Sequence, residues 1–216
     1  MHHGVFCGSL ASMRETRILI LGESHHISTK KESENNKEHG KPATYPTYSV
    51  IEEYLEDIDK KEKNLRFFEK IAKTFGAYSS LQDEREKFWE QVYFGNYIEE
   101  LCDIQTGFAR RQVKEKSINY NQNLFEFVNQ HEIDKIFCFS ILSYNNLPSA
   151  EISRKDEIGK RGNRRVYLRQ CTYKAGVVRE NLPSLKKDLI VYGISHPSAR
   201  GGYALEAYTE ALKNQF

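Results

Sequence analysis

Two polar segments of the sequence bring together side chains that could take part in catalysis. The first, Gly22 to His26, holds an acid, a serine and two histidines, and the second, Gly193 to Tyr203, holds a His-Pro-Ser motif, an arginine and two glycines. The carboxylate of Glu23 could stabilise a developing positive charge or position a water, and the imidazole of His196 could donate to a leaving group or act as a base. Ser24 could serve as a nucleophile for such a base.

Both polar segments directly follow short apolar runs of the kind that forms buried strands. Such runs, ended by turn residues, occur at 17–21, 134–140 and 188–193. They are typical of strands that are covered on both faces in a parallel sheet. Ligands of such sheets bind beyond the carboxyl ends of the strands. We therefore expect the two polar segments to face each other, provided that their strands are neighbours.

The rest of the sequence supplies helices and one further strand. Residues 166–173 alternate apolar and polar side chains, which predicts an edge strand with one solvated face. Apolar residues at helical spacing predict helices within 50–58, 65–75, 88–101, 124–128 and 203–212. This order of elements predicts an α/β fold, a three-layer α/β/α sandwich around a mainly parallel, roughly four-stranded sheet.

One domain accounts for nearly all of the 216 residues. We expect it to cover 14–216 and to be preceded by a leader or expression remnant at 1–13, which does not resemble a signal peptide. Within the domain, 28–47 is polar and contains two prolines, which predicts a loop. The apolar runs are far shorter than the ~20 residues that cross a bilayer, so we expect no membrane contact.

The four cysteines are scattered, at positions 7, 102, 138 and 171. They form no Cys-x-x-Cys pair and have no histidine at ligand spacing, so we expect no metal, no iron–sulfur cluster and no other cofactor. Free thiols in a reducing compartment are the simplest interpretation, and they predict a cytoplasmic protein. His25 and His26 are adjacent and point apart in a regular strand or helix, which makes them a poor pair of metal ligands.

Positive charge is concentrated in one segment, residues 154–179. The whole chain has a formal net charge of only +2, whereas this segment carries nine Lys or Arg against two acids, a local charge of +7. A solvated face is one interpretation of such a run. An anionic partner such as a nucleic acid is the other.

The two polar segments and their strands resemble the uracil-DNA glycosylase superfamily. The first motif of that family corresponds to Leu19 to Ser24, and the last corresponds to His196-Pro197-Ser198, roughly a full domain later. Phe94 to Tyr97 is similar to the middle segment of the family. Residues 134–140, followed by Leu147-Pro148, are similar to its central strand and the turn after it. The resemblance extends over most of the chain, but only in separate short segments.

The resemblance implies a DNA-repair enzyme that hydrolyses the N-glycosidic bond of a damaged or deaminated base. Glu23 would stabilise the oxocarbenium-like sugar and position the water, since iron–sulfur members also have a Glu after the motif glycine. His196 would donate to the base O2 as a neutral imidazole, and Asn96 would recognise the edge of a flipped pyrimidine. The candidates for the aromatic shelf beneath that base are Tyr45, Tyr48 and Tyr97.

The expected partner is DNA, single- or double-stranded, or another nucleobase-containing ligand. The residues expected to contact its backbone belong to the loop after the last strand and to the basic segment, and they are Ser198, Arg200, Gly201, Gly202, Arg161, Arg164 and Arg165. The sequence leaves open which base is recognised, which strand form is preferred and which oligomeric state the protein adopts.

Departures from the family pattern leave two other functions open. His25-His26 stand where the family usually has a proline, the cluster-binding cysteines are missing, and 199–202 lack the leucine that some members wedge into the duplex. A non-catalytic nucleic-acid- or nucleobase-binding protein is the first alternative. The second is an esterase of the Gly-Asp-Ser type with Ser24 as nucleophile and His196 as base, although this chain lacks the Asp expected two residues before the histidine.

Overall fold

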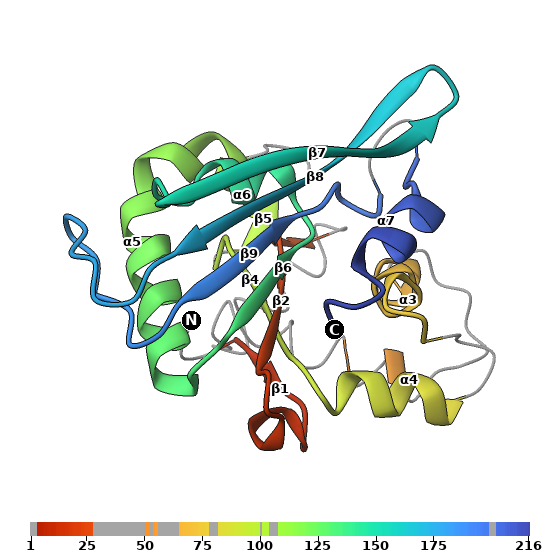
Figure 1. Ribbon diagram of the computed structural model, residues 1–216, viewed down its shortest axis with the longest axis horizontal. Coiled ribbons are helices and arrows are strands. Elements are labelled where there is room, and N and C mark those ends of the chain that lie inside the picture. The colour runs from red at the N-terminus through yellow and green to blue at the C-terminus, as the bar shows by residue number, and fades with distance from the viewer. Residues whose placement is uncertain are drawn as a thin grey trace.

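The computed structural model describes residues 4–27, 51, 54–55, 65–77, 82–99, 101–103, 108–198 and 202–216. Its centre is a seven-stranded sheet in the order β1-β4-β2-β6-β9-β8-β7 (Figure 1). The strands are β1 (Phe6–Cys7), β2 (Ile18–Gly22), β4 (Tyr93–Asn96), β6 (Lys135–Cys138), β7 (Ile152–Arg161), β8 (Arg164–Tyr173) and β9 (Leu189–Gly193). The middle four, β4, β2, β6 and β9, are parallel, and β1, β8 and β7 are antiparallel to their neighbours. A separate parallel pair joins β3 (His25–Ile27) to β5 (Leu101–Asp103).

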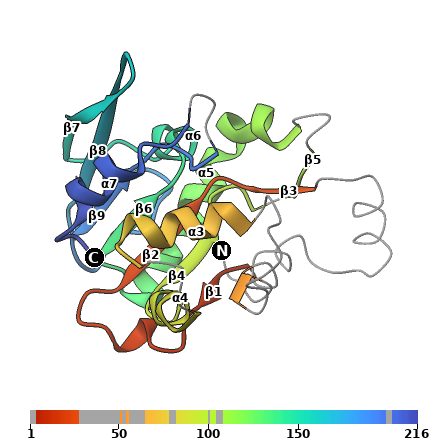
Figure 2. The same ribbon diagram turned by 90° about the vertical axis from the view of Figure 1, so that its right-hand side faces the viewer.

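Helices cover both faces of the sheet. The long α5 (Phe108–His131) and the short α6 (Ile141–Asn145) lie on one face. The other face carries α3 (Leu65–Thr74), α4 (Gln82–Trp89) and α7 (Leu205–Leu212), which are in front of the sheet in Figure 2. A single 3₁₀ turn, η1 (Ala11–Met13), follows β1. The α/β class is thus confirmed, but the expected four strands are wrong, because antiparallel strands extend the parallel centre on both sides.

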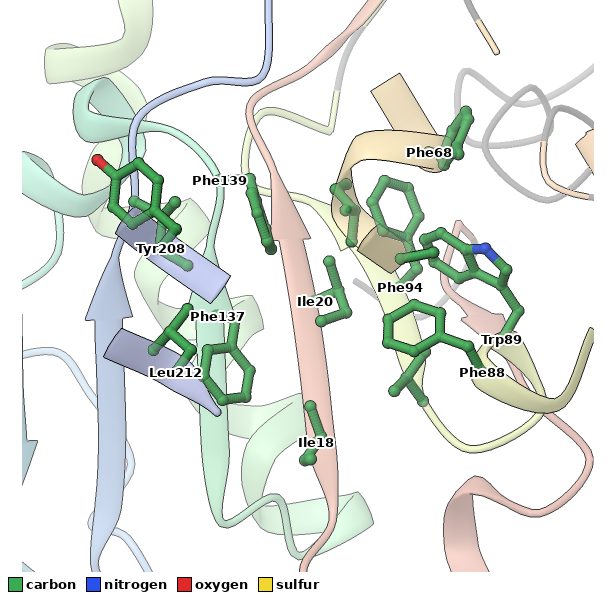
Figure 3. Close-up of a cluster of buried hydrophobic side chains, with 14 of the residues drawn as sticks. Ile18, Ile20, Phe68, Phe88, Trp89, Phe94, Phe137, Phe139, Tyr208 and Leu212 are labelled. Atoms are coloured by element: carbon green, nitrogen blue, oxygen red, sulfur yellow. The ribbon is translucent and has the colours of Figure 1, made fainter. Parts of the chain in front are cut away.

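The central strands are apolar throughout because both of their faces are covered. In β2, Leu19 and Leu21 belong to the core under α5, and Ile18 and Ile20 belong to the core on the opposite face. All four are 0% exposed. Figure 3 shows Ile18 and Ile20 beside aromatic side chains of β6, β4, α3 and α4. Burial on both sides explains why continuous apolar runs were a reliable signal for β2, β6 and β9.

Two expectations about single elements are wrong. The helix expected over 88–101 ends at Trp89, and Tyr93–Asn96 is strand β4 between β1 and β2. Apolar residues that fill both faces of a short strand also satisfy helical spacing over a short window, which is why the two could not be told apart. Strand β8 is not at the edge of the sheet, since it pairs with both β9 and β7. The edge is β7, whose side chains are mostly exposed.

The remaining expected helices are present where they are described. Residues 65–75 form α3, 124–128 lie inside the longer α5, and α7 begins at Leu205. Of 50–58, only positions 51, 54 and 55 are described, and they are helical. The loop expected at 28–47 lies outside the described residues.

Part of the segment assigned to a leader contributes to the fold. Phe6 pairs with Phe94 of β4 and is buried, and Ala11 is 0% exposed. Residues 6–11 therefore add an edge strand and a core contact to the domain. Among the helices that the structure describes, none has the length and apolar character needed to cross a membrane.

The buried thiols provide a chemical test of this fold. Cys138 is 0% exposed, and burial raises its pKa to about 12; burial also raises the pKa of Cys171. Because the thiolate is the reactive form, we expect iodoacetamide at pH 8 to leave both unlabelled in the native protein and to label them after unfolding in urea. Cys7 is exposed, and partial burial raises its pKa too, so it should react in the native protein, more slowly than free cysteine. Peptide mass spectrometry measures each site, and rapid native labelling of Cys138 would contradict the central position of β6.

Candidate functional site

The candidate catalytic residues gather at the carboxyl edge of the four parallel strands. Along the chain these strands come in the order β2, β4, β6 and β9, but in the sheet the order is β4-β2-β6-β9. The chain leaves β2 toward one side and later returns on the other side, which makes the boundary between β2 and β6 a topological switch point. Open α/β sheets bind their ligands at such a point. Glu23 follows β2 there, and Ser140 closely follows β6.

Glu23 and His196 do not follow neighbouring strands. Strand β6 lies between β2 and β9, so the expectation that the two polar segments face each other directly is corrected. Two strand spacings separate them, about 10 Å across the sheet. Both residues still lie at the same edge, because the three strands are parallel. Ser140 comes at the end of the strand between them.

The carboxylate of Glu23 is buried and held by a hydrogen bond. Its side chain belongs to a residue that is only 5% exposed. The Ser140 hydroxyl donates to Glu23 Oε2 at 2.7 Å, and Ser140 Oγ accepts from the backbone N–H of Ser143 at 3.2 Å as the N-cap of α6. The Glu23 carbonyl also accepts from the Ile98 amide at 2.9 Å. The acid is therefore fixed to the end of β6 by its side chain and to the segment after β4 by its backbone.

The Asn96 amide lies against Gly22, the residue before Glu23, because Gly22 has no side chain. Asn96 is the last residue of β4, where it pairs with Gly22 at the end of β2. A Cβ at position 22 would collide with Asn96 Oδ1, so the amide occupies the space that any larger residue would fill. Asn96 thus ends a strand rather than lying in a helix, and the strand places its amide at the carboxyl edge of the sheet, next to the end of β2.

Two side chains of α3 contact the His-Pro-Ser loop and hold it in place. The ring of His196 stacks on Phe67 with centroids 5.0 Å apart and 29° between planes. Lys70 Nζ donates to the Pro197 carbonyl at 2.8 Å. Phe67 also makes an edge contact with Phe94 of β4, at 6.4 Å between centroids, which links the loop to the strand that ends in Asn96.

Phe67 and Lys70 were not predicted as site residues. The sequence contained a signal for Phe67, because two consecutive phenylalanines on a helix cannot both lie on one narrow core stripe. No comparable signal exists for Lys70.

The geometry of the loop selects one tautomer of His196. Nδ1 accepts a hydrogen bond from the Ser198 amide at 3.1 Å. A neutral ring that accepts at Nδ1 carries its proton on Nε2, so Nε2 is the donor. Protonating Nδ1 would set two N–H groups against each other, and the contact therefore favours the neutral imidazole. The same contact occupies the amide of Ser198, a residue expected to contact DNA.

The other predicted residues have different positions. Tyr97 is excluded as an aromatic shelf because it is buried on the α5 face, and its hydroxyl lies 3.0 Å from both Asn121 Oδ1 and the Asn146 carbonyl. Burial raises the pKa of Tyr97 well above its usual range. Ser24 is half-buried one residue after Glu23. The candidates outside the described residues are Tyr45, Tyr48, Arg200 and Gly201.

Gly202 and the three arginines of the basic segment belong to another part of the edge. Arg161 and Arg164 flank the turn between β7 and β8, Arg165 follows on β8, and all three are exposed. Gly202 has a φ of +87°, and the guanidinium of Arg161 lies against it. His25 and His26 form β3, and their side chains are outside the described set. In the described part of the chain, no group of three His, Cys, Asp or Glu is placed to hold a metal ion.

No protein-family model matches this sequence, and a comparison with curated proteins finds no match either. The function of the site must therefore be argued from its own residues.

Replacing Ser140 tests the hydrogen bond that holds Glu23. Ser140→Ala removes both the donor to the carboxylate and the N-cap of α6, so we expect the free energy of unfolding to fall by about 1–3 kcal/mol. In a Glu23→Gln background the cost should be smaller, since the hydrogen bond to a neutral acceptor is about half as strong while the loss of the N-cap is unchanged. Urea unfolding followed by tryptophan fluorescence measures all four proteins of this cycle.

Ser143→Ala is the matched control for this cycle. Ser143 lies on the same helix, and its Oγ is buried without a hydrogen-bond partner among the described residues. Its replacement should therefore leave the unfolding free energy within about 0.5 kcal/mol of the original value. A Ser140→Ala cost equal to that of the control, or an unchanged cost when Glu23→Gln is also present, would contradict the assigned bond.

Proposed function

We propose that this chain hydrolyses the N-glycosidic bond of a damaged or deaminated base in DNA, as a divergent protein similar to the uracil-DNA glycosylases. The observation that carries the proposal is the buried carboxylate of Glu23, held by Ser140 at the switch point and directly after Gly22, against which the Asn96 amide lies. His196, which follows the parallel strand β9 and has its tautomer set by the Ser198 amide, supports the proposal. Each of these residues also belongs to one of the segments that resemble the family.

Hydrolysis breaks the bond between C1′ of the sugar and the base nitrogen. The bonding electron pair leaves with the base, and the sugar gains oxocarbenium character. Glu23 stabilises that positive charge and accepts a proton from the attacking water, whose oxygen forms the new bond to C1′. The departing base takes up a proton from solvent, which leaves a free base and an abasic site.

The leaving base is contacted by His196, which stabilises its negative charge, and by Asn96, which recognises its edge. With its proton on Nε2, neutral His196 donates a hydrogen bond to a base carbonyl oxygen, where the charge develops. The Asn96 amide offers both a donor and an acceptor, the pair needed to recognise a pyrimidine edge. Because a stacked base cannot reach these groups, the target nucleotide must be flipped out of the duplex or come from a single strand. Tyr45 and Tyr48, which lie outside the described residues, stay the candidates for the shelf beneath it.

Base release from defined oligonucleotides tests the proposal. With enzyme in excess, strands carrying uracil, hypoxanthine, xanthine or an alkylated base are incubated and then cleaved with alkali at abasic sites. We expect release of at least one base, and a single-turnover rate about 10²–10³-fold lower in Glu23→Gln and in His196→Ala, since each removes a charge-stabilising group. The control is Glu180→Gln, which alters an exposed acid in the turn after β8 and should release the base at the original rate.

Three results would overturn the proposal. Intact DNA binding without release of any base would favour a non-catalytic binding protein. Hydrolysis of p-nitrophenyl esters that disappears in Ser24→Ala would favour the esterase. Base release that persists in Glu23→Gln would remove the acid from its assigned role.

A further inference from the structure

The last two strands of the sheet extend beyond its carboxyl edge. Strand β8 pairs with β9 only as far as Arg169, which lies opposite Gly193 at the end of β9. Residues 164–168 continue past that point and pair only with β7. At about 3.3 Å per residue this overhang is about 17 Å long. We call the paired ribbon at 156–168 the arm, and its turn projects from the molecule at the upper right of Figure 1.

The structure separates the basic segment into a base, in which three of five cations have ion pairs, and a charged tip without acids. Near the base, three cations have acidic partners: Arg154 with Asp156, Lys174 with Asp188, and Arg179 with Glu151. The tip, 158–166, contains four basic residues and no acid.

Among the residues that the structure describes, only one of the four cations at the tip has an acidic partner. Arg165 contacts Glu157 at 3.2 Å. Lys160, Arg161 and Arg164 are exposed and form no ion pair with the residues described. Four of the nine cations of the segment, three of them without an ion pair among the described residues, therefore lie at the tip of the arm, where no acid accompanies them.

The cations of the tip cover both faces of the ribbon. Lys160 lies opposite Arg165, and Arg161 lies opposite Arg164. Successive pairs of an antiparallel ribbon point to opposite faces, so each face carries two cations. Like charges directly opposite one another destabilise a ribbon, whereas pairs of mixed sign would protect its edges equally well. Protection against aggregation alone does not explain the pattern.

The arm is fixed to the loop that carries His196. The Tyr208 hydroxyl lies 3.2 Å from the Tyr167 carbonyl in the arm and 2.9 Å from Ser195 Oγ, and it accepts from the Ser195 amide at 3.1 Å. Gly159 lies against Ala207 of α7. Whatever the arm binds is therefore held in a fixed position relative to the residue before His196.

We infer that the arm is a two-stranded ribbon that enters a groove of duplex DNA next to the candidate site. The inference names the partner of that site and rests on the proposed function. The major groove, about 12 Å wide, admits such a ribbon, and its two phosphate walls match cations on both faces. At 3.4 Å per base pair the overhang spans about five pairs.

The residues of the tip favour a duplex over a single strand. Sites for single strands combine a basic groove with exposed aromatic rings on which bases stack. The tip at 158–166 contains no aromatic residue. Tyr167, the nearest ring, is covered by Lys155 Nζ at 4.0 Å from its centroid.

Binding of unmodified DNA tests the arm without requiring any chemistry. The variant Lys160→Ala/Arg164→Ala removes one unpaired cation from each face and each strand. Fluorescence anisotropy with a labelled 20-base-pair duplex should show about tenfold or greater weakening at 100 mM salt, and the slope of log K against log salt should decrease by about 1.8, or 0.9 for each lost phosphate contact. The charge-conserving Lys160→Arg/Arg164→Lys should retain both the affinity and the slope.

Lys186→Ala/Lys213→Ala is the control, because it removes the same charge from exposed residues at the opposite edge of the sheet. It should change the affinity less than twofold. An arm variant that matches this control would overturn the inference, and so would an equal loss of affinity for a single strand of the same length. A protein that binds duplex through the arm but releases no base would refute the proposed function alone. Base release with arm-independent binding would refute this inference alone.

Discussion

The hydrogen bond from Ser140 to Glu23 is the interaction on which the site depends. A carboxyl group at 5% exposure loses most of its hydration and needs a hydrogen-bond partner in return. Ser140 supplies that donor from the end of β6 while it caps α6, so the helix, the strand and the acid are held as one unit. The bond crosses the boundary between β2 and β6. The bond therefore holds the Glu23 carboxyl group in a defined position at the topological switch point.

The elements that could be predicted from the sequence are those whose burial produces an unambiguous pattern of apolar residues. β2, β6 and β9 are covered on both faces, and their continuous apolar runs were interpreted as buried strands. β4 was missed because Val92 and Tyr93 continue the spacing of Phe88 and Trp89 in the preceding helix, and Tyr97 and Ile98 continue it further. β7 was missed for the opposite reason, since an edge strand with two exposed faces needs no apolar alternation. The pairing of β8 with both β9 and β7 is what shows that β7, and not β8, is the edge strand.

The site was predictable to the extent that it depends on strand ends. Glu23 and His196 each follow a buried run, and parallel strands bring such positions to one edge. The contacts that hold them come from elsewhere: Ser140 from the end of a strand in between, and Phe67 and Lys70 from a crossing helix. No local pattern encodes these contacts, because each joins residues more than a hundred positions apart. Packing of α3 over the sheet creates the two that hold the His-Pro-Ser loop.

The charges of the arm destabilise the ribbon, because like charges lie opposite one another. Their position next to the turn limits this loss of stability. An isolated two-stranded ribbon is marginal in water, and opposed like charges weaken it further. In this chain Arg154, Lys174 and Arg179 have acidic partners near the base of the arm, and Tyr208 and Ala207 support the first part of the overhang. The opposed cation pairs, at 160 with 165 and at 161 with 164, lie next to the turn, where no core residue depends on them. Local violations of stability rules are typical of functional sites. A phosphate backbone would supply the missing counter-charges on both faces at once, so the ribbon should be more stable with its partner than without it.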